Sequence, residues 1–353
     1  MARVTLQTIA DKVGVSRMTV SNAFSRPDQL SAALRETILA TAEDLGYVGP
    51  DPAARALARG TTGAVGIVLT DSMKAAFRDD VATAFFGALA EELAPTGLAV
   101  TLIPLYGSAD VIPARDVAID AALVYACPGF APAVDWLIRR QLPLVFVDRT
   151  PTPEAASITI DEESGGRLGA EHLVGLGHRH VGLLTVAYDG PHGVVADPAS
   201  AGGDFVARGR VAGWVSGLQA AGVRITAVQV RENTENDGYE GAQLLLDHDD
   251  RPTGVLCFSD LMAWGTIRAA HDLSLAVPQD LSVVGFDDSR LARRVRPALT
   301  TVRQDVVAKG RAAAEALIEA IARHRAGSDE EPEHVVLPTE LVVRHSTGAP
   351  PAA

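Results

Sequence analysis

Side chains that can read DNA bases stand close together near the start of the chain. Arg17, Met18, Ser21 and Asn22 fall on one arc of a short segment if it is helical, because successive residues of a helix turn by roughly 100°. Guanidinium, hydroxyl and amide groups on such an arc can hydrogen-bond to base edges in the major groove. The pattern therefore predicts DNA as a partner, although short helices around a turn also occur in proteins that never touch DNA.

Four aspartates form a second pattern, because each follows an apolar run typical of a buried strand. They are Asp71, Asp148, Asp260 and Asp287. In open parallel sheets ligands bind beyond the carboxyl ends of the strands, and carboxylates there can accept hydrogen bonds from the hydroxyls of a sugar or nucleoside. Arg210, at the start of an expected helix, can donate hydrogen bonds to ligand oxygens. The alternative for such an aspartate is that it caps the next helix, as Asp260 can.

Three other residues are weaker candidates for chemistry. Phe85 can form an apolar wall of the ligand site, although an aromatic residue on a helix is more often part of the core. His178 and His180 can share one strand face but lack further ligands at metal spacing, so we expect polar surface at a strand start, no metal and no cofactor. The chain also lacks a Walker loop, G-x-G-x-x-G and G-x-S-x-G, and we expect no enzyme.

The base-reading arc needs a helix-turn-helix to hold it. Thr5 can cap a first helix, Gly14 supplies the turn, and Ser16 can cap the second helix. A third helix is expected from the cap Ser31 to Gly46. These signals predict a small three-helix bundle with a modest apolar core.

A short basic segment at 51–60 follows this bundle. Asp51 is a plausible cap, Pro52 suits the first helical position, and the interior is rich in alanine and arginine. The segment is shorter than the ~12–15 residues that an isolated helix needs in water, which predicts a helix that folds on a partner. Arg55 would face phosphates, and Leu57 would insert between base pairs in the minor groove. An ordinary linker helix is the alternative.

Five segments together resemble the LacI/GalR family of transcription regulators, from about Val4 to about Ser346. In chain order they are TLQTIADKVGVSRMTVS, DPAARALARG, EHLVGLGHRHVGLL, GRVAGW and LSVVGFDD. The resemblance implies a regulator, usually a repressor, that binds a palindromic double-stranded operator as a homodimer. Recognition helices would enter successive major grooves, and paired hinge helices the minor groove between them. A small effector bound between two lobes would control binding allosterically.

By this resemblance particular residues take particular roles. Arg17, Met18 and Asn22 fall on base-reading positions, and Leu57 on the intercalating leucine. The residues expected to contact DNA are Thr5, Ser16, Arg17, Met18, Ser21, Asn22, Arg55 and Leu57. Those expected at the effector are Asp148, Arg210, Asp260, Asp287, Asp71 and Phe85, the first four by resemblance to the family. Asn22 departs from the arginine of several well-known members, so their operator sequences cannot be carried over.

The charge of the chain is unevenly distributed. The net charge is −13, yet residues 1–60 hold seven basic and six acidic residues, so the first 60 residues carry +1 and the remainder −14. An acidic body weakens nonspecific DNA binding and leaves specificity to the head. We recognise no export signal and no apolar run that could span a bilayer. The only two cysteines, Cys127 and Cys257, are isolated from each other. We therefore expect a cytoplasmic protein that does not contact the membrane.

From residue 63 short apolar runs alternate with helical patterns, which predicts an α/β fold. Strands are expected at 64–70, 99–104, 121–126, 144–147, 181–186, 254–258 and 282–286. They would form a two-lobed, periplasmic-binding-protein-like body of parallel sheets. We place the change of lobe near 159–161, the return near 288–300, a long helix at 305–323 and a closing strand at 335–343.

The expected organisation is a helix-turn-helix domain at 1–49, a hinge helix at 50–60, an effector-binding and dimerisation domain at 61–346, and a tail at 347–353. A Gly- and Pro-rich loop at 187–204, which contains His192, would rim the ligand site. The alternative function is a cytoplasmic sugar-binding receptor without a transcriptional role, because the same two-lobed fold serves transport. Such receptors, however, are exported. The effector, its sign as inducer or co-repressor, and the operator stay open.

Overall fold

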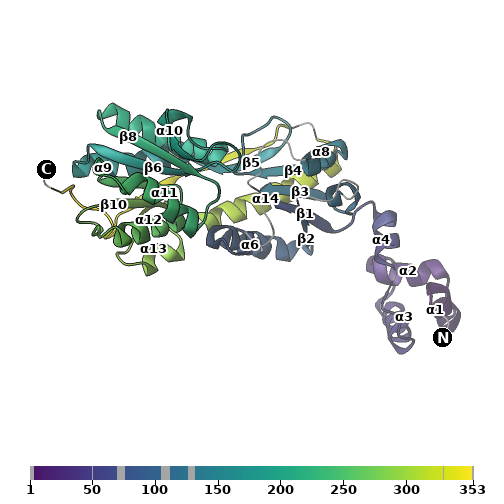
Figure 1. Ribbon diagram of the computed structural model, residues 1–353. Coiled ribbons are helices and arrows are strands. Elements are labelled where there is room, and N and C mark those ends of the chain that lie inside the picture. The colour runs from purple at the N-terminus through teal and green to yellow at the C-terminus, as the bar shows by residue number, and fades with distance from the viewer. Residues whose placement is uncertain are drawn as a thin grey trace. The chain divides into compact units, whose positions relative to one another are not determined.

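The computed structural model describes residues 4–49, 51–69, 76–104, 112–125, 132–328 and 330–351. It divides into two compact units, 1–63 and 64–353. The first is helical, and the second is a two-lobed α/β body (Figure 1). Asp71 and Cys127, which the sequence singled out, lie outside the described residues. Among the described residues, no helix has the length and apolar character that a bilayer span requires.

The first unit forms the expected helix-turn-helix. Helix α1 spans Leu6–Val13, α2 spans Arg17–Ser25 and α3 spans Ala32–Asp44. Thr5, Ser16 and Ser31 each cap a helix by accepting a hydrogen bond from a backbone N–H, and Gly14 has the left-handed φ of 78°. The fully buried core is small and consists of Ile9, Ala10, Val20, Ala23, Ile38 and Ala42.

The segment after this bundle is helical, as expected. Helix α4 spans Pro52–Arg59, and the Asp51 carboxylate accepts a hydrogen bond from the N–H of Ala54 at 3.2 Å. Leu57 is 87% exposed and belongs to none of the apolar clusters among the described residues. The helix is present here without DNA, so folding on a partner stays a prediction.

The N-terminal lobe of the body is built on a parallel sheet with the strand order β12-β5-β4-β3-β1-β2. Its strands are β1 Ala64–Leu69, β2 Ala99–Pro104, β3 Ala121–Tyr125, β4 Leu144–Val147, β5 Ala156–Ile160 and β12 His334–Leu337. Helix α6 (Asp80–Leu93) and the long α14 (Val306–Ala326) pack against each other, and α14 also contacts β3, β4 and β5. The short helices α7 (Pro113–Asp116) and α8 (Pro132–Arg139) form a second pair.

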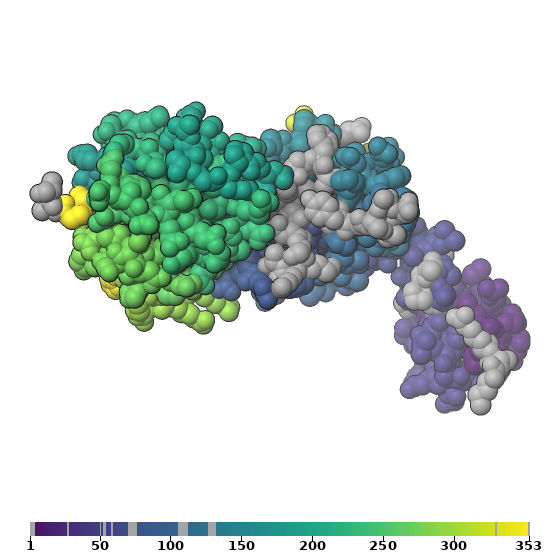
Figure 2. Space-filling model, viewed as in Figure 1, coloured from purple at the N-terminus to yellow at the C-terminus, as the bar shows by residue number. Residues whose placement is uncertain are grey.

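The C-terminal lobe has a second sheet with the order β13-β11-β10-β9-β6-β8-β7, in which the two edge strands are antiparallel. Its strands are β6 His180–Val186, β7 Gly193–Val195, β8 Arg224–Val230, β9 Gly254–Cys257, β10 Ser282–Asp287, β11 Thr300–Gln304 and β13 Thr339–Val342. The pairs α9 (Glu162–Leu176) with α10 (Phe205–Ala220), and α11 (Glu235–Leu246) with α12 (Asp260–Asp272), flank this sheet (Figure 1), and the short α13 spans Arg290–Arg294. Figure 2 shows one face of the body, on which this lobe is coloured teal to light green.

The chain passes between the two sheets three times. It leaves β5 for α9 near residue 161, leaves β11 for α14 at 305, and passes from β12 to β13 at 338. The first crossing is confirmed. The expected return near 288–300 is wrong, because this stretch leads into β11, a strand that we did not expect, and the lobe changes only after Gln304. The expected single strand at 335–343 is also wrong, since β12 and β13 belong to different sheets.

Two smaller expectations are corrected. His178 and His180 are 1% and 9% exposed, so they are not polar surface. His178 contacts the hydroxyls of Thr253 and Ser282 at 2.8 and 3.0 Å, and the carbonyl of Gly348 at 3.1 Å. The segment expected as a tail therefore begins with contacts to the C-terminal lobe.

Candidate functional site

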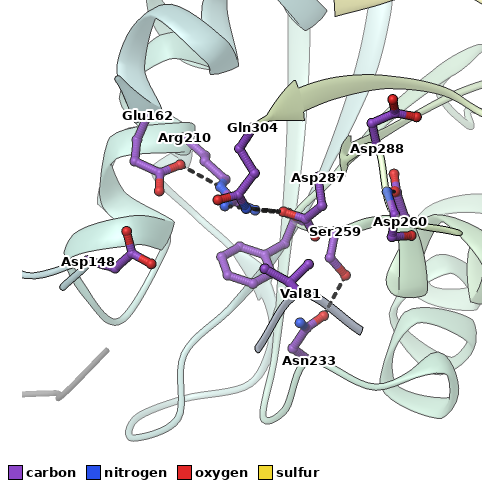
Figure 3. Close-up of polar contacts among 12 residues, drawn as sticks. Val81, Asp148, Glu162, Arg210, Asn233, Ser259, Asp260, Asp287, Asp288 and Gln304 are labelled. Carbon is purple, nitrogen blue, oxygen red and sulfur yellow. Dashed lines mark hydrogen bonds and ion pairs between the residues drawn. The ribbon is translucent and has the colours of Figure 1, made fainter. Parts of the chain in front are cut away.

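A buried polar network lies where the carboxyl ends of both sheets meet, and Arg210 of α10 is its centre (Figure 3). The Nε of Arg210 donates to Glu162 at 2.7 Å, and its Nη2 lies 3.6 Å from the Asp287 carboxylate. A third contact goes to the backbone carbonyl of Phe258. All three charged residues are at most 9% exposed, so each charge depends on its partners.

Close packing of two helices brings Arg210 to Glu162. A Cβ on Gly213 of α10 would lie 2.0 Å from the backbone oxygen of Glu163 on α9. Only a glycine therefore allows the two helices to approach this closely. The guanidinium also stacks 3.6 Å from the ring centroid of Phe286, which adds a cation–π contact.

The network continues from Asp287 into the N-terminal lobe. Gln304, the last residue of β11, donates from Nε2 to Asp287 at 2.7 Å, and its Oε1 accepts from Lys309 of α14 at 2.7 Å. Lys309 also donates to Asp148, which follows β4, at 2.7 Å. A continuous chain of hydrogen bonds and ion pairs thus joins Glu162 in one lobe to Asp148 in the other.

Burial changes the proton affinities of these carboxyls. It raises the pKa of Glu162 to about 7 and that of Asp287 to about 8, although Arg210 between them acts in the opposite direction. Burial likewise raises the pKa of Asp260 to about 7, against hydrogen bonds from Thr301 and Ser289. The charge of the network therefore changes close to neutral pH.

The backbone is strained at the same place. Asp148 has φ = 54°, Asp287 has φ = 111° and Asp288 has φ = 53°. Residues other than glycine rarely adopt a positive φ, and strained backbone of this kind is often found at binding sites. Asp288 lies apart from Arg210 in Figure 3 and instead pairs with Arg303 at 2.8 Å and with Arg344.

Aromatic residues of the N-terminal lobe border the network. The ring centroids of Tyr125, at the end of β3, and Phe85 are 4.8 Å apart. Burial first, then the carboxylates of Asp148, Asp79 and Asp287, raise the pKa of Tyr125. Phe85 itself is completely buried in the core, so the structure favours the core role over the wall of the site.

The head presents a different kind of surface. Arg17 and Met18 are exposed, Met18 by 69%, while Ser21 and Asn22 are half-buried on the same helix α2. Asn22 donates from Nδ2 to the Oε1 of Gln29 at 3.1 Å. Thr5 and Ser16 accept hydrogen bonds from backbone N–H groups at the starts of α1 and α2, and Arg55 and Leu57 are exposed on α4.

Comparison with known proteins decides the family. Residues 5–49 match the model for bacterial regulatory proteins of the lacI family, and residues 170–347 match the periplasmic binding protein-like domain. An HTH-type transcriptional regulator of Mycolicibacterium smegmatis is 37% identical over 99% of this chain and 98% of its own length. The chain belongs to the LacI family.

Solved structures agree with this membership. The lac repressor dimer bound to operator and the anti-inducer ONPF has a TM-score of 0.78 at 26% identity, covering 99% of this chain and 100% of the repressor chain. The transcriptional regulator CelR in complex with cellobiose has a TM-score of 0.69 at 26% identity, covering 98% and 100%. This LacI-family protein is thus a DNA-binding transcriptional regulator, and its named relatives are regulators rather than enzymes.

The structure brings only some of the expected effector residues together. Asp148, Arg210 and Asp287 belong to one network, whereas Asp71 lies outside the described residues. Both carboxylate oxygens of Asp260 are used within the C-terminal lobe, by the hydroxyl of Thr301 at 2.5 Å and by the N–H of Ser289 at 2.7 Å. This favours a structural role for Asp260.

Sequence reasoning missed three members of the network. Glu162 looked like an ordinary acidic residue in the first turn of a helix. Gln304 ends the strand that we did not expect. Lys309 did carry a signal, because it stands four and eight residues before Ala313 and Leu317, on the buried stripe of α14.

The loop at 187–204 contains regular structure. It contains the edge strand β7, which pairs with β8. Gln229 holds it by donating to the carbonyl of Pro191 at 2.6 Å and accepting from the N–H of Gly202 at 3.3 Å. His192 contacts the carbonyl of Ala187 at 2.8 Å. A role as rim of the ligand site stays a prediction.

Proposed function

We propose that this LacI-family regulator is a repressor that binds a palindromic operator as a homodimer and responds to a small effector held between the lobes of its body. A sugar or a nucleoside-like compound suits the site. The observation that carries the effector site is the buried network from Glu162 to Asp148, because it joins residues of both lobes at the carboxyl ends of their strands.

The exposure of the head supports its proposed contacts. Arg17 and Met18 are free to reach base edges, and the amide of Asn22 lies on the same helix. A leucine that is 87% exposed between two exposed arginines, Arg55 and Arg59, suits a wedge in the minor groove with phosphates on either side. The lac repressor dimer, to which this chain is structurally similar, is bound to operator, which supports DNA as the partner of the head.

Three observations support the effector site. Its polar groups are nearly all buried, its backbone is strained at Asp148 and Asp287, and its members come from both lobes. A related regulator, CelR, is known in complex with cellobiose. A ligand that favours one arrangement of the lobes would move the two hinge segments of the dimer together or apart, with a coupling of typically ~1–3 kcal/mol.

Capture of DNA tests the regulator. The purified full chain is mixed with fragmented genomic DNA, with and without neutral sugars and nucleosides, and the retained fragments are sequenced. We expect a recurring palindrome whose retention changes with one of the added compounds. Retention of no specific sequence under any condition would contradict the proposal.

Two variants test its parts. Leu57→Ala should weaken operator binding by about tenfold or more, since the wedge that bends the duplex is lost, while Leu244→Ala, at an exposed leucine of α11, is the matched control. Asp148→Asn should blunt the response to effector and preserve operator binding. Equal loss of both activities in Asp148→Asn would indicate a purely structural role.

A further inference from the structure

Asn22 of the head is held by a residue that lies beyond the end of its own helix. Its Nδ2 donates a hydrogen bond to the Oε1 of Gln29 at 3.1 Å. Helix α2 ends at Ser25, and Gln29 is the last residue of the short 3-10 helix η1, Pro27–Gln29. The contact therefore joins two elements and does not follow from the spacing of residues along α2.

The backbone around η1 fixes the place of Gln29. The N–H of Gln29 donates to the carbonyl of Arg26 at 3.1 Å, and the N–H of Arg26 donates to the carbonyl of Asn22 at 2.8 Å. The next residue, Leu30, packs against the buried core of the head, and Ser31 caps α3. Anchors on both sides thus bring the Gln29 side chain back to Asn22.

The direction of this hydrogen bond decides what Asn22 can offer to DNA. A side-chain amide has two N–H donors and one carbonyl oxygen that accepts. Gln29 uses one N–H of Asn22, and none of the described residues makes another hydrogen bond with this side chain. Asn22 is half-buried, so part of it reaches solvent. One N–H donor and the Oδ1 acceptor therefore remain for a partner.

One donor beside one acceptor matches a single base in the major groove. Adenine presents the N7 acceptor next to the N6 amino donor, whereas guanine presents two acceptors, O6 and N7. Cytosine offers only a donor there, and thymine only an acceptor and a methyl group. An arginine, which has donors alone, suits guanine. Asparagine at position 22 therefore changes the base that this position can read.

We propose that Asn22 reads an adenine in each half-site of the operator, and that Gln29 is the positioning residue that orients the Asn22 amide. This inference rests on the proposed operator binding by α2 and deepens it by naming one base. The opposite orientation, in which Gln29 donates to the Oδ1 of Asn22, would leave Asn22 with two donors and would favour guanine.

Gln29 can also connect this reading to the DNA backbone. Its side chain is exposed, and its Oε1 accepts from Asn22, so both of its own N–H donors remain. Side-chain amides donate to phosphate oxygens in protein–DNA complexes, and such contacts fix the register of the protein on the duplex. A row of hydrogen bonds from phosphate through Gln29 and Asn22 to the base would hold the Asn22 amide in one orientation.

Selection of binding sites from random DNA tests the base. The full chain is used as wild type and as Asn22→Ala, and the position at which only the variant loses its preference is assigned to Asn22. We expect an A·T pair there in wild type, favoured about tenfold or more over G·C, and a switch to G·C in Asn22→Arg. A G·C pair in wild type, or preferences that Asn22→Ala leaves unchanged, would overturn the inference, although specific binding by the head would stand.

A modified base then separates adenine from its paired thymine. Replacing the assigned adenine by 7-deazaadenine removes the N7 acceptor and keeps the base pair. The modified operator should bind wild type more weakly, because the N–H of Asn22 loses its acceptor. It should bind Asn22→Ala as well as the unmodified operator does. Equal binding of both operators by wild type would overturn the reading of adenine.

Variants of Gln29 test its positioning role, with circular dichroism as the check on folding. Gln29→Ala should lower the preference for A·T at this position by about threefold or more and keep the other preferences. Gln29→Glu restores an acceptor and should restore the preference, although its negative charge should weaken binding to all sequences alike. Gln7→Ala is the matched control, because the exposed Gln7 donates to Asp11 at 2.7 Å within α1. It should change no base preference.

A double variant shows whether Gln29 acts through Asn22. In the Asn22→Ala background, Gln29→Ala should change the preference at this position no further. An unchanged A·T preference in Gln29→Ala, or a loss that Gln29→Glu does not restore, would overturn the positioning role. If wild type selects no sequence at all, the inference fails together with the proposed function.

Discussion

The head and the body hold their functional side chains in opposite ways. In the head, Met18 is 69% and Leu57 87% exposed, and their neighbours do not depend on them. In the body, Arg210 and Lys309 are at most 4% exposed and each holds carboxylates in place. Exposed DNA contacts such as Met18 and Leu57 can thus change with little cost to the fold, whereas the charged residues of the proposed effector site also stabilise the body.

The largest effect should come from removing the central cation of the body. Arg210→Ala leaves Glu162 and Asp287 buried without their partner, and should lower the free energy of unfolding by about 3–5 kcal/mol. Denaturation followed by tryptophan fluorescence measures this in the body alone, because Trp136, Trp214 and Trp264 all lie there. Arg208→Ala, at an exposed position of the same helix, should change little. Equal stability of both variants would contradict the stabilising role of Arg210 in the body.

An arginine of the head should show the opposite behaviour. Arg17→Ala should cost about 1–3 kcal/mol of operator affinity and relax the preference at one base position, with the stability of the head almost unchanged. Selection of binding sites from random DNA measures the preference. Arg26→Ala, at an exposed arginine just after α2, is the control and should leave the base preference as it is. A fall in head stability for Arg17→Ala would contradict its free-standing position.

Stability of the body should fall between pH 6.5 and 8. The folded-state pKa values of Glu162 and Asp287, about 7 and 8, exceed their ordinary values of 4.5 and 3.8. The folded state therefore keeps protons that the unfolded state has released, and each costs up to about 1.4 kcal/mol per pH unit as the pH rises. Glu162→Gln should flatten the slope, and the exposed Glu163→Gln should not.

Buried histidines also make the stability of the body depend on pH, at the lower end of the range from pH 6.5 to 8. Burial lowers the pKa of His172, His178 and His180 below 6.5, so their contribution to stability is lost as the pH falls below this value. Between pH 6.5 and about 7.5 the unfolded chain still holds some of their protons, so these histidines oppose the fall due to the two carboxyls, but they contribute equally to wild type and to Glu162→Gln and cancel in that comparison. Equal slopes for wild type and Glu162→Gln between pH 6.5 and 8 would show that Glu162 is ionised in the folded body throughout this range.

The smallest effect should come from a helix cap of the head. Ser16→Ala removes the hydrogen bond to the N–H of Thr19, which is 3.0 Å long, and should cost about 1 kcal/mol. Thermal unfolding followed by circular dichroism measures it, with Ser21→Ala as the control for the loss of a hydroxyl on the same helix. A tryptophan signal that shifts with Ser16→Ala would show that the head and the body do not unfold independently.

The head could be predicted almost completely because its signals are local. The caps at Thr5, Ser16 and Ser31 and the turn at Gly14 act within four residues of their position in the chain, and the core follows helical spacing. Several parallel strands of the body could be predicted for a similar reason, since β1 and β4 are short, continuous apolar runs. The parallel strands β5 (ASITI) and β8 (RITAVQV) contain polar residues and were not expected.

The effector site could be predicted only in part, because its members meet through contacts far apart in sequence. Strand β11 has the sequence TTVRQ, which holds only one apolar residue and so lacks the continuous apolar run by which the other strands were predicted. Because this strand was not predicted, the return to the N-terminal lobe was placed too early in the chain. Gln304 and Lys309 were therefore not recognised as members of the network. Asp148 and Lys309 are 161 residues apart, and no local pattern predicts that pairing.

The N-terminal lobe has a consequence for synthesis on the ribosome. Its edge strand β12 and its long helix α14 come from residues 306–337, although its first strand begins at residue 64. The head can fold as soon as it emerges, but this lobe must wait until almost the whole chain is made. Until then β5 remains an open strand edge, which is prone to pair with other chains. A chain released early would therefore keep a folded head attached to an aggregation-prone body.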